Sequence, residues 1–274
     1  MQQQSAVGIA PRPGLDAKAN TQLRESALKE ERRETMKSYR GNAIAVGVLL
    51  IACTAVSILS AVPLGSTLDG SDYLSKLAVS GNGVVLTALI EFVWAATGAG
   101  IAIGLYPVLR KYNRSLALGS VVSRTVEGMF ILVGTLSLLA LLTIGQESAA
   151  AGPAAASSFK AVGDSLLAVR DWAHGFLGLL PFGVGALMYY YLLYRSRLVP
   201  RWLSGWGLIG AGLLVGSTVY AGFIQEFGFS TVNTALNIPI LLQEMVLAVW
   251  LIVKGFKASA LASAASAGGS GGRS

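Results

Sequence analysis

Cysteine and histidine are almost absent from this chain, which holds one of each, Cys53 and His174, among 274 residues. A single cysteine excludes a disulfide within the chain. A single histidine excludes histidine-rich zinc sites and a haem held by two histidines. No Gly-rich phosphate loop, Ser nucleophile elbow or HExxH motif is present either. The sequence therefore predicts no metal site and no cofactor.

Charged residues are also scarce, at 13% of the chain against 53% hydrophobic residues. Soluble domains usually carry about twice that charged fraction. The apolar residues gather in six runs that reach the roughly 20 residues a membrane-spanning helix needs. The sequence predicts an all-α, polytopic bundle of six transmembrane helices, at about residues 43–64, 82–109, 118–144, 172–194, 203–223 and 235–256.

The distribution of Lys and Arg indicates the orientation of the bundle. Seventeen of them lie in the N-terminal segment, the 110–117 loop, the 195–201 loop and the C-terminal tail, whereas the alternating segments hold three. Because basic loops stay in the cytoplasm, both termini are predicted to be cytoplasmic. We expect a multi-pass protein of the bacterial inner (plasma) membrane, whose basic blocks are topology signals and not a nucleic-acid surface.

Three parts are expected along the chain. Residues 1–42 form a charged, partly helical cytoplasmic segment, residues 43–256 the transmembrane domain, and residues 257–274 a low-complexity disordered tail. Two segments between spans, 71–77 and 158–172, are expected to form short interfacial helices.

Four charged residues fall near the middle of the predicted spans. Glu91, Glu127 and Glu244 each lie about nine residues into a span, which places them near mid-membrane, and Arg124 lies one turn before Glu127. Helical spacing puts them on stripes of small and polar residues that face other helices, namely Thr87, Glu91, Ala95, Gly98 and Ala102, then Ser120, Arg124, Glu127 and Gly134, then Asn237 and Glu244.

One arginine cannot neutralise three glutamates. An unpaired central charge costs about 2.5–3.5 kcal/mol on insertion scales, so at least one glutamate is expected to be protonated at neutral pH. We expect Arg124 to bridge to Glu91 or Glu244 on another helix. The charges either fix the bundle geometry as polar contacts or form a site for a proton or a ligand, and the sequence leaves both interpretations open.

A second polar group lies at the outer mouth of the fourth span. Asp171 and His174 share a helix face with Gly178, Pro181 and Gly185. Pro181 predicts a kink. His174 either carries protons between water and the deeper glutamates or is hydrogen-bonded at the interface.

Two further patterns concern packing and anchoring. Gly100–Gly104 and Gly212–Gly216 are small-xxx-small pairs, which predict helix packing within the bundle or between protomers. Six aromatic residues are expected to form an inner anchoring belt, namely Tyr189, Tyr190, Tyr191, Tyr194, Trp202 and Trp206.

Over roughly residues 43–256 the chain resembles the uncharacterised bacterial membrane family catalogued as domain of unknown function 4386. The stretches that carry the resemblance are "PVLRKYNRSLAL", "SRTVEG", "HG" at the start of the fourth span, "YRSRLVPRWLSGWGLIGAG" and "QEMVLAVWLIVKGF". The family pattern is similar at Arg124, Glu127, His174, Arg195, Ser196, Pro200 and Glu244, and it places an acidic residue near Glu91. The chain departs from it at residues 175–177. The resemblance implies six helices and a shared site, and it implies no activity.

The leading hypothesis is an integral membrane protein that binds or moves a small or lipid-like molecule through a buried, proton-titratable polar cavity. Its candidate site residues are Glu91, Arg124, Glu127, Asp171, His174 and Glu244. One alternative is an intramembrane acid–base enzyme acting on a lipid or isoprenoid. Another is a structural or regulatory protein whose charged N-terminal helix meets a cytoplasmic partner. Membrane lipids are expected partners, nucleic acid is not, and an oligomer is left open.

Overall fold

The structure, a computed structural model, describes residues 13–227 and 230–262 of the chain, and these residues form helices with no strand among them. Six helical stretches are long and apolar enough to cross a membrane, which confirms the predicted all-α bundle. They are Arg33–Leu59 of α1 (Pro13–Leu59), α3 (Gly81–Leu109), α4 (Arg114–Ala151), the continuous stretch Ala156–Ser196, α7 (Arg201–Ile224) and α8 (Thr231–Val253). The chain is a multi-pass membrane protein in its architecture.

The fourth stretch is one helix with an irregular turn in it. It consists of α5 (Ala156–Trp172), the π-helical turn η2 (Ala173–Gly178) and α6 (Leu179–Ser196). The turn lies just before Pro181, which lacks the N–H that would otherwise bond back into this turn. The segment predicted as a separate interfacial helix is therefore the first part of a single long helix.

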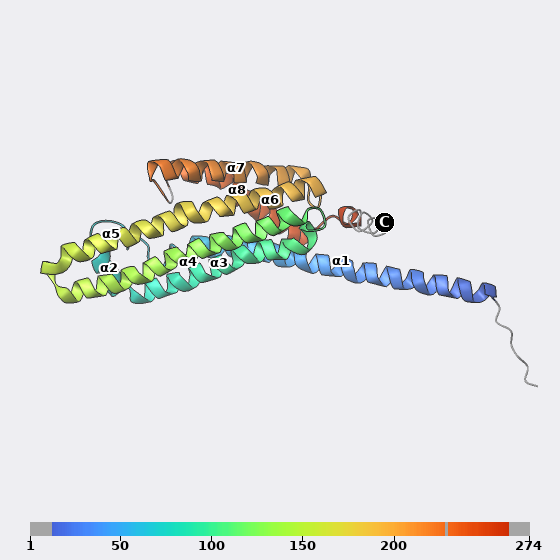
Figure 1. Ribbon diagram of the computed structural model, residues 1–274, viewed down its shortest axis with the longest axis horizontal. Coiled ribbons are helices and arrows are strands. Elements are labelled where there is room, and N and C mark those ends of the chain that lie inside the picture. Colours follow the sequence, from blue (N-terminus) through green and yellow to red (C-terminus); the bar gives the residue numbers. More distant parts are fainter. Residues whose placement is uncertain (1–12, 228–229, 263–274) are drawn as a thin grey trace, which may run out of the picture.

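The spans form a closed ring. Each packs mainly against two neighbours, in the order α1, α3, α4, α6, α7 and α8, and α8 returns to α1. The N-terminal half of α1 extends alone beyond the other helices, at the end of the bundle where the described C-terminal residues also lie (Figure 1). We call this end, which also holds the turns at 110–113 and 197–200, the basic end, and the opposite end the far end.

Local signals at the helix ends explain where the chain turns. The Asn113 side chain accepts a hydrogen bond from the Leu116 backbone N–H at 2.9 Å and so caps the start of α4. Ser230 does the same for α8 through the Asn233 N–H. After α8, Gly255 takes the left-handed conformation (φ +70°) that ends a helix.

The seam between α1 and α8 closes the ring. At the basic end the Arg40 guanidinium donates hydrogen bonds to three carbonyls of the last turn of α8, those of Leu251, Ile252 and Val253. Further along, Gly47 lets the two backbones approach, because a Cβ there would lie 2.7 Å from the Ala248 carbonyl oxygen.

Beyond the spans, the far end carries a helical layer of its own. α4 and α5 extend past the shorter α7 and α8, and the small helix α2 (Tyr73–Val79) packs against α4 (Figure 1). Tyr73 in this layer donates a hydrogen bond from its hydroxyl to Asp164 at 2.8 Å. The predicted short helix at 71–77 is thus confirmed as α2.

Several local expectations need correction. α1 continues without a break through residue 42, so the charged segment and the first span are one helix. Residues 257–262 are packed and not disordered, because Leu261 is buried and the Tyr112 hydroxyl donates to the Ala260 carbonyl. The rest of the expected tail, 263–274, lies outside the described residues.

The two glycine pairs behave differently. Gly100 and Gly104 pack against Leu49 and Val46 of α1, as a packing pair should. At Gly212 and Gly216 an added Cβ would meet nothing within 4 Å, so this pair does not mediate packing within the described chain.

Replacing Gly47 by Val should weaken the α1–α8 seam, because the new side chain would press on Ala248 and on Ile252, whose Cγ1 would lie 2.6 Å from the new Cβ. Overpacking of this kind costs about 1–3 kcal/mol. Thermal unfolding in detergent micelles should show a clearly lower midpoint for G47V. The matched variant G212V adds the same residue to open space and should unfold close to wild type. Equal midpoints for the two variants would contradict the closed seam.

Candidate functional site

Two adjoining chambers lie inside the helix ring. The large chamber, of about 630 Å³, is at the far end, where the loop after α1 and Phe227 form part of its wall. The small chamber, of about 180 Å³, lies deeper, among α1, α3, α4, α6, α7 and α8. Both chambers are lined by the same five residues where they meet, namely Ser57, Trp94, Leu179, Asn237 and Leu241.

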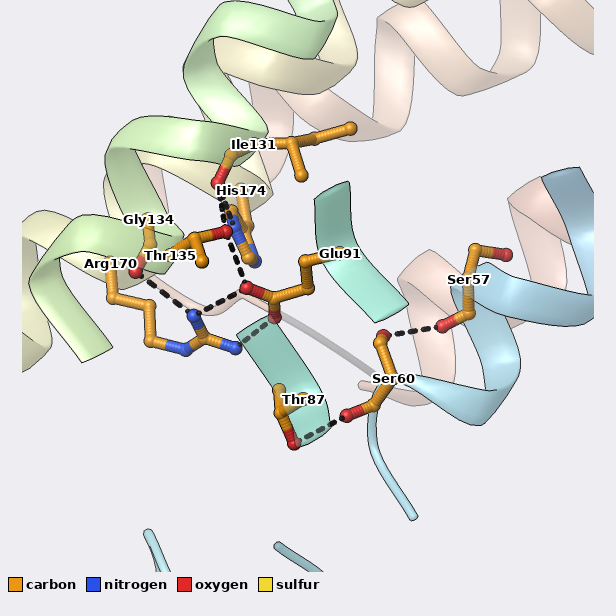
Figure 2. A network of polar contacts seen from close by, with 9 residues as sticks. All are labelled: Ser57, Ser60, Thr87, Glu91, Ile131, Gly134, Thr135, Arg170 and His174. Carbon is orange, nitrogen blue, oxygen red and sulfur yellow. Dashed lines mark hydrogen bonds and ion pairs between the residues drawn. The ribbon is translucent and has the colours of Figure 1, made fainter. Parts of the chain in front are cut away.

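Glu91 forms the charged centre of the large chamber's wall. Its carboxylate accepts hydrogen bonds from Arg170 Nη2 to Oε1 at 2.5 Å and from Thr135 Oγ1 to Oε2 at 2.7 Å (Figure 2). Arg170 Nη1 also donates to the Gly134 carbonyl at 3.0 Å. Glu91 is 1% exposed. The network therefore ties α3, α4 and α5 together with its donors and acceptors paired.

The expectation that Arg124 bridges to Glu91 or Glu244 is wrong. Glu91 pairs with Arg170, and Arg124 pairs with Glu127 on its own helix, with Nη1 and Oε2 2.8 Å apart. The physical reason is geometric: α5 returns Arg170 to the level of Glu91, and Glu127 lies one turn after Arg124 on α4. The four central charges thus belong to two clusters and not to one.

His174 lies in the π-helical turn beside the Glu91 network. Its Nε2 is 3.0 Å from the Ile131 carbonyl oxygen, which only accepts, so Nε2 carries the proton (Figure 2). The ring meets Trp94 edge-on, with centroids 5.9 Å apart. Gly134 makes room for it, since a Cβ there would clash with the imidazole. Of the two roles considered, the hydrogen-bonded one is present, and His174 also lines the large chamber.

Arg124 is the most deeply buried charge of the small chamber, at 2% exposure. Its Nε donates to the Gly98 carbonyl at 3.2 Å, and its guanidinium stacks over the Phe182 ring at 4.4 Å from the centroid. Cys53 lies beside it, with Sγ 3.9 Å from Nη2. Arginine is held here by an ion pair, a carbonyl and an aromatic face, as a buried guanidinium requires.

Glu244 lies on the opposite wall of the small chamber and differs from the other two glutamates. The Tyr189 hydroxyl donates to its Oε1 at a long 3.3 Å. Among the described residues no Lys, Arg or His forms an ion pair with it. A carboxylate at this depth is stabilised by taking up a proton or by meeting a cationic group.

Tyr189 and Tyr190 are not part of an anchoring belt, as the sequence suggested. They are 1% and 0% exposed, and the Tyr190 hydroxyl donates to Gln243 Oε1, whose amide in turn donates to the Leu203 carbonyl. Helix rotation explains the error, because only some of the consecutive tyrosines of α6 can face outward. Tyr191, Tyr194 and Trp202 are exposed and suit the anchoring role.

The polar stripes in the sequence correctly predict which candidate residues face the inside of the bundle. They do not predict which residues pair with them. Every member of the stripes on α3 and α4 is buried, and Asn237 and Glu244 share the small chamber. Asp171 lines the large chamber. The sequence-based prediction missed three site residues, Arg170, Thr135 and Trp94. The sequence signal for Arg170 was its position next to the candidate Asp171. No three His, Cys, Asp or Glu side chains of residues 13–227 and 230–262 are grouped to hold a metal ion.

Comparison with known families gives one match. The family described as Domain of unknown function (DUF4386) matches residues 45–255, a range that contains both chambers' charged residues. The chain belongs to this family. Its description carries no activity, so membership of DUF4386 assigns no function to the chain. No curated protein and no solved structure matched the chain significantly.

Removing one partner of the Glu91–Arg170 pair should destabilise the protein strongly, because the remaining charge stays buried. We expect about 3 kcal/mol for E91Q and for R170Q singly, and a clearly smaller loss for the double variant than the two single losses added. Denaturant unfolding in mixed micelles measures this. The exposed pair Lys37–Glu34, with both side chains 59% exposed, is the control, and K37Q should change stability by less than about 1 kcal/mol. Additive losses at Glu91 and Arg170 would show that the pair is not coupled.

Proposed function

We propose that this protein binds a small or lipid-like molecule in the two chambers and moves it under control of a proton at Glu244. The main observation behind this proposal is that Glu244 faces a chamber deep inside the bundle without an ion-pair partner among the described residues. A charge that served only to join helices would be in an ion pair with another helix, as Glu91 is with Arg170.

The shape of the site supports ligand binding. Small-molecule sites are typically concave, about 300–1,000 Å³ in volume and mostly apolar with a few polar groups. The large chamber lies in this range. Its wall combines Trp94, Leu179 and Leu241 with polar groups such as Asn237, and the small chamber continues it towards Glu244.

Two kinds of charge therefore have two roles in this proposal. The Glu91–Arg170 pair and the Arg124–Glu127 pair are each internally compensated and hold the walls in place. Glu244 is the group that changes its proton when ligand enters or leaves. His174, bonded to Ile131, stands on the large chamber's wall between the far end and the deeper carboxylates.

Native mass spectrometry of the purified protein tests the proposal. Wild type should retain a bound small molecule, and E244Q should lose it while keeping the wild-type melting temperature. E147Q is the matched control, because Glu147 is an exposed carboxylate on α4 that lines neither chamber. Occupancy should depend on pH in wild type and in E147Q and not in E244Q. Equal occupancy in all three proteins would contradict a role for Glu244.

The proposal places the protein in the inner membrane of a bacterium, with the basic end in the cytoplasm and the large chamber facing outward. In a C53S background, a cysteine at Ser71 in the far-end loop should react with a membrane-impermeant maleimide in intact cells. A cysteine at Ser115, near the start of α4 at the basic end, should react only after lysis. Both positions are exposed, so access to the reagent is the only difference. The reverse pattern would invert the orientation.

A further inference from the structure

The unpaired charges on the chamber walls are all negative. Both arginines that line the chambers, Arg124 and Arg170, are in ion pairs with glutamates. The lining carboxylates of Asp69, Asp171 and Glu244 take part in no ion pair among the described residues. Because the two arginine–glutamate pairs are each neutral overall, the charge that the chamber walls present to a ligand is negative.

These three carboxylates are spread along the depth of the cavity. Asp69 is exposed in the loop after α1 at the far end, Asp171 is exposed on the wall of the large chamber, and Glu244 lies in the small chamber. A cleft lined by one sign of charge attracts ligands of the opposite sign and repels those of the same sign. The path from the mouth to mid-membrane therefore favours a cation at each stage.

The uncharged lining indicates the rest of the ligand. Trp94 lines both chambers, and an indole ring is the best aromatic partner for an organic cation. Phe182 is already covered by the Arg124 guanidinium. Leu179 and Leu241 continue the wall beside Trp94, so an apolar group attached to the cation has a surface to pack on.

We infer that the ligand is a lipophilic monovalent organic cation, such as an amine or a quaternary ammonium carrying an apolar group. Its positive charge is held by the Glu244 carboxylate and its apolar part lies beside Trp94. A single charge matches the single unpaired carboxylate of the small chamber. This inference rests on the proposed function and names the class of molecule that the same site takes.

A proton and the cation compete for Glu244 under this assignment. The ionisable groups around Glu244 are Arg124 and Glu127 from α4, Tyr189 and Tyr190 from α6 and Cys53 from α1, while α3 and α7 contribute Trp94 and Leu214 to the chamber. Arg124 is compensated by Glu127. Cation binding should therefore strengthen as the pH rises and weaken as Glu244 is protonated.

Three probes of nearly one shape test the sign of the charge. Benzyltrimethylammonium is a cation, neopentylbenzene is its neutral analogue, and phenylmethanesulfonate is an anion of similar size. Equilibrium dialysis against the purified full chain in micelles, with protein-free micelles as blank, measures the binding of each. Wild type and E147Q should bind the cation saturably and most tightly. E244Q should bind it about tenfold more weakly or worse, which is about 1.4 kcal/mol.

The other outcomes are equally decisive. Tighter binding of the anion or the neutral probe, no saturable cation binding, or cation binding that E244Q leaves unchanged would each overturn the cation assignment. Retention of a native molecule by wild type and its loss in E244Q would in that case leave the proposed function standing. If wild type and E244Q retain the same native molecule, or none, the proposed function fails as well.

Discussion

An arginine inside an apolar bundle keeps its charge, and the whole arrangement of this protein depends on how that charge is compensated. Arg170 on α5 meets Glu91 on α3, whereas Arg124 meets Glu127 on the same helix. The first pair joins α3 to the long α5–α6 helix and the second fixes a guanidinium against Gly98 of α3. The two pairs use up both cations that line the chambers, and Glu244 is left facing the small chamber without one.

The chambers lie at the centre of a closed ring of helices. The ring closes at the α1–α8 seam, where Gly47 and Arg40 bring the two helices together. Polar side chains on the inner faces of the ring, such as Ser57 and Asn237, line the central space. The deeper chamber has a volume of about 180 Å³, and the chamber at the far end, where loop residues take part in the wall, has one of about 630 Å³.

The sequence predicts those parts of the fold that depend on local pattern. Six spans follow from run length and apolar content, and the buried faces of α3 and α4 follow from helical periodicity at Glu91 and Glu127. What it could not predict depends on how helices are rotated and how far they continue. Arg170 becomes a partner of Glu91 only because α5 runs on into α6, and Tyr189 faces inward only because α6 is turned that way. Similarly, the unbroken α1 cannot be inferred from a change in composition near residue 42.

The π-helical turn at Ala173–Gly178 determines how α5 is rotated relative to α6. Such a turn holds one residue more than the α-helical turn it replaces. Each residue advances an α-helix by about 100°, so the same residues in an unbroken α-helix would rotate α5 by about that angle relative to α6. Arg170 would then point away from Glu91 while Tyr189 kept its place. The wider π-helical turn thus takes up the extra residue and keeps the two halves of the long helix aligned.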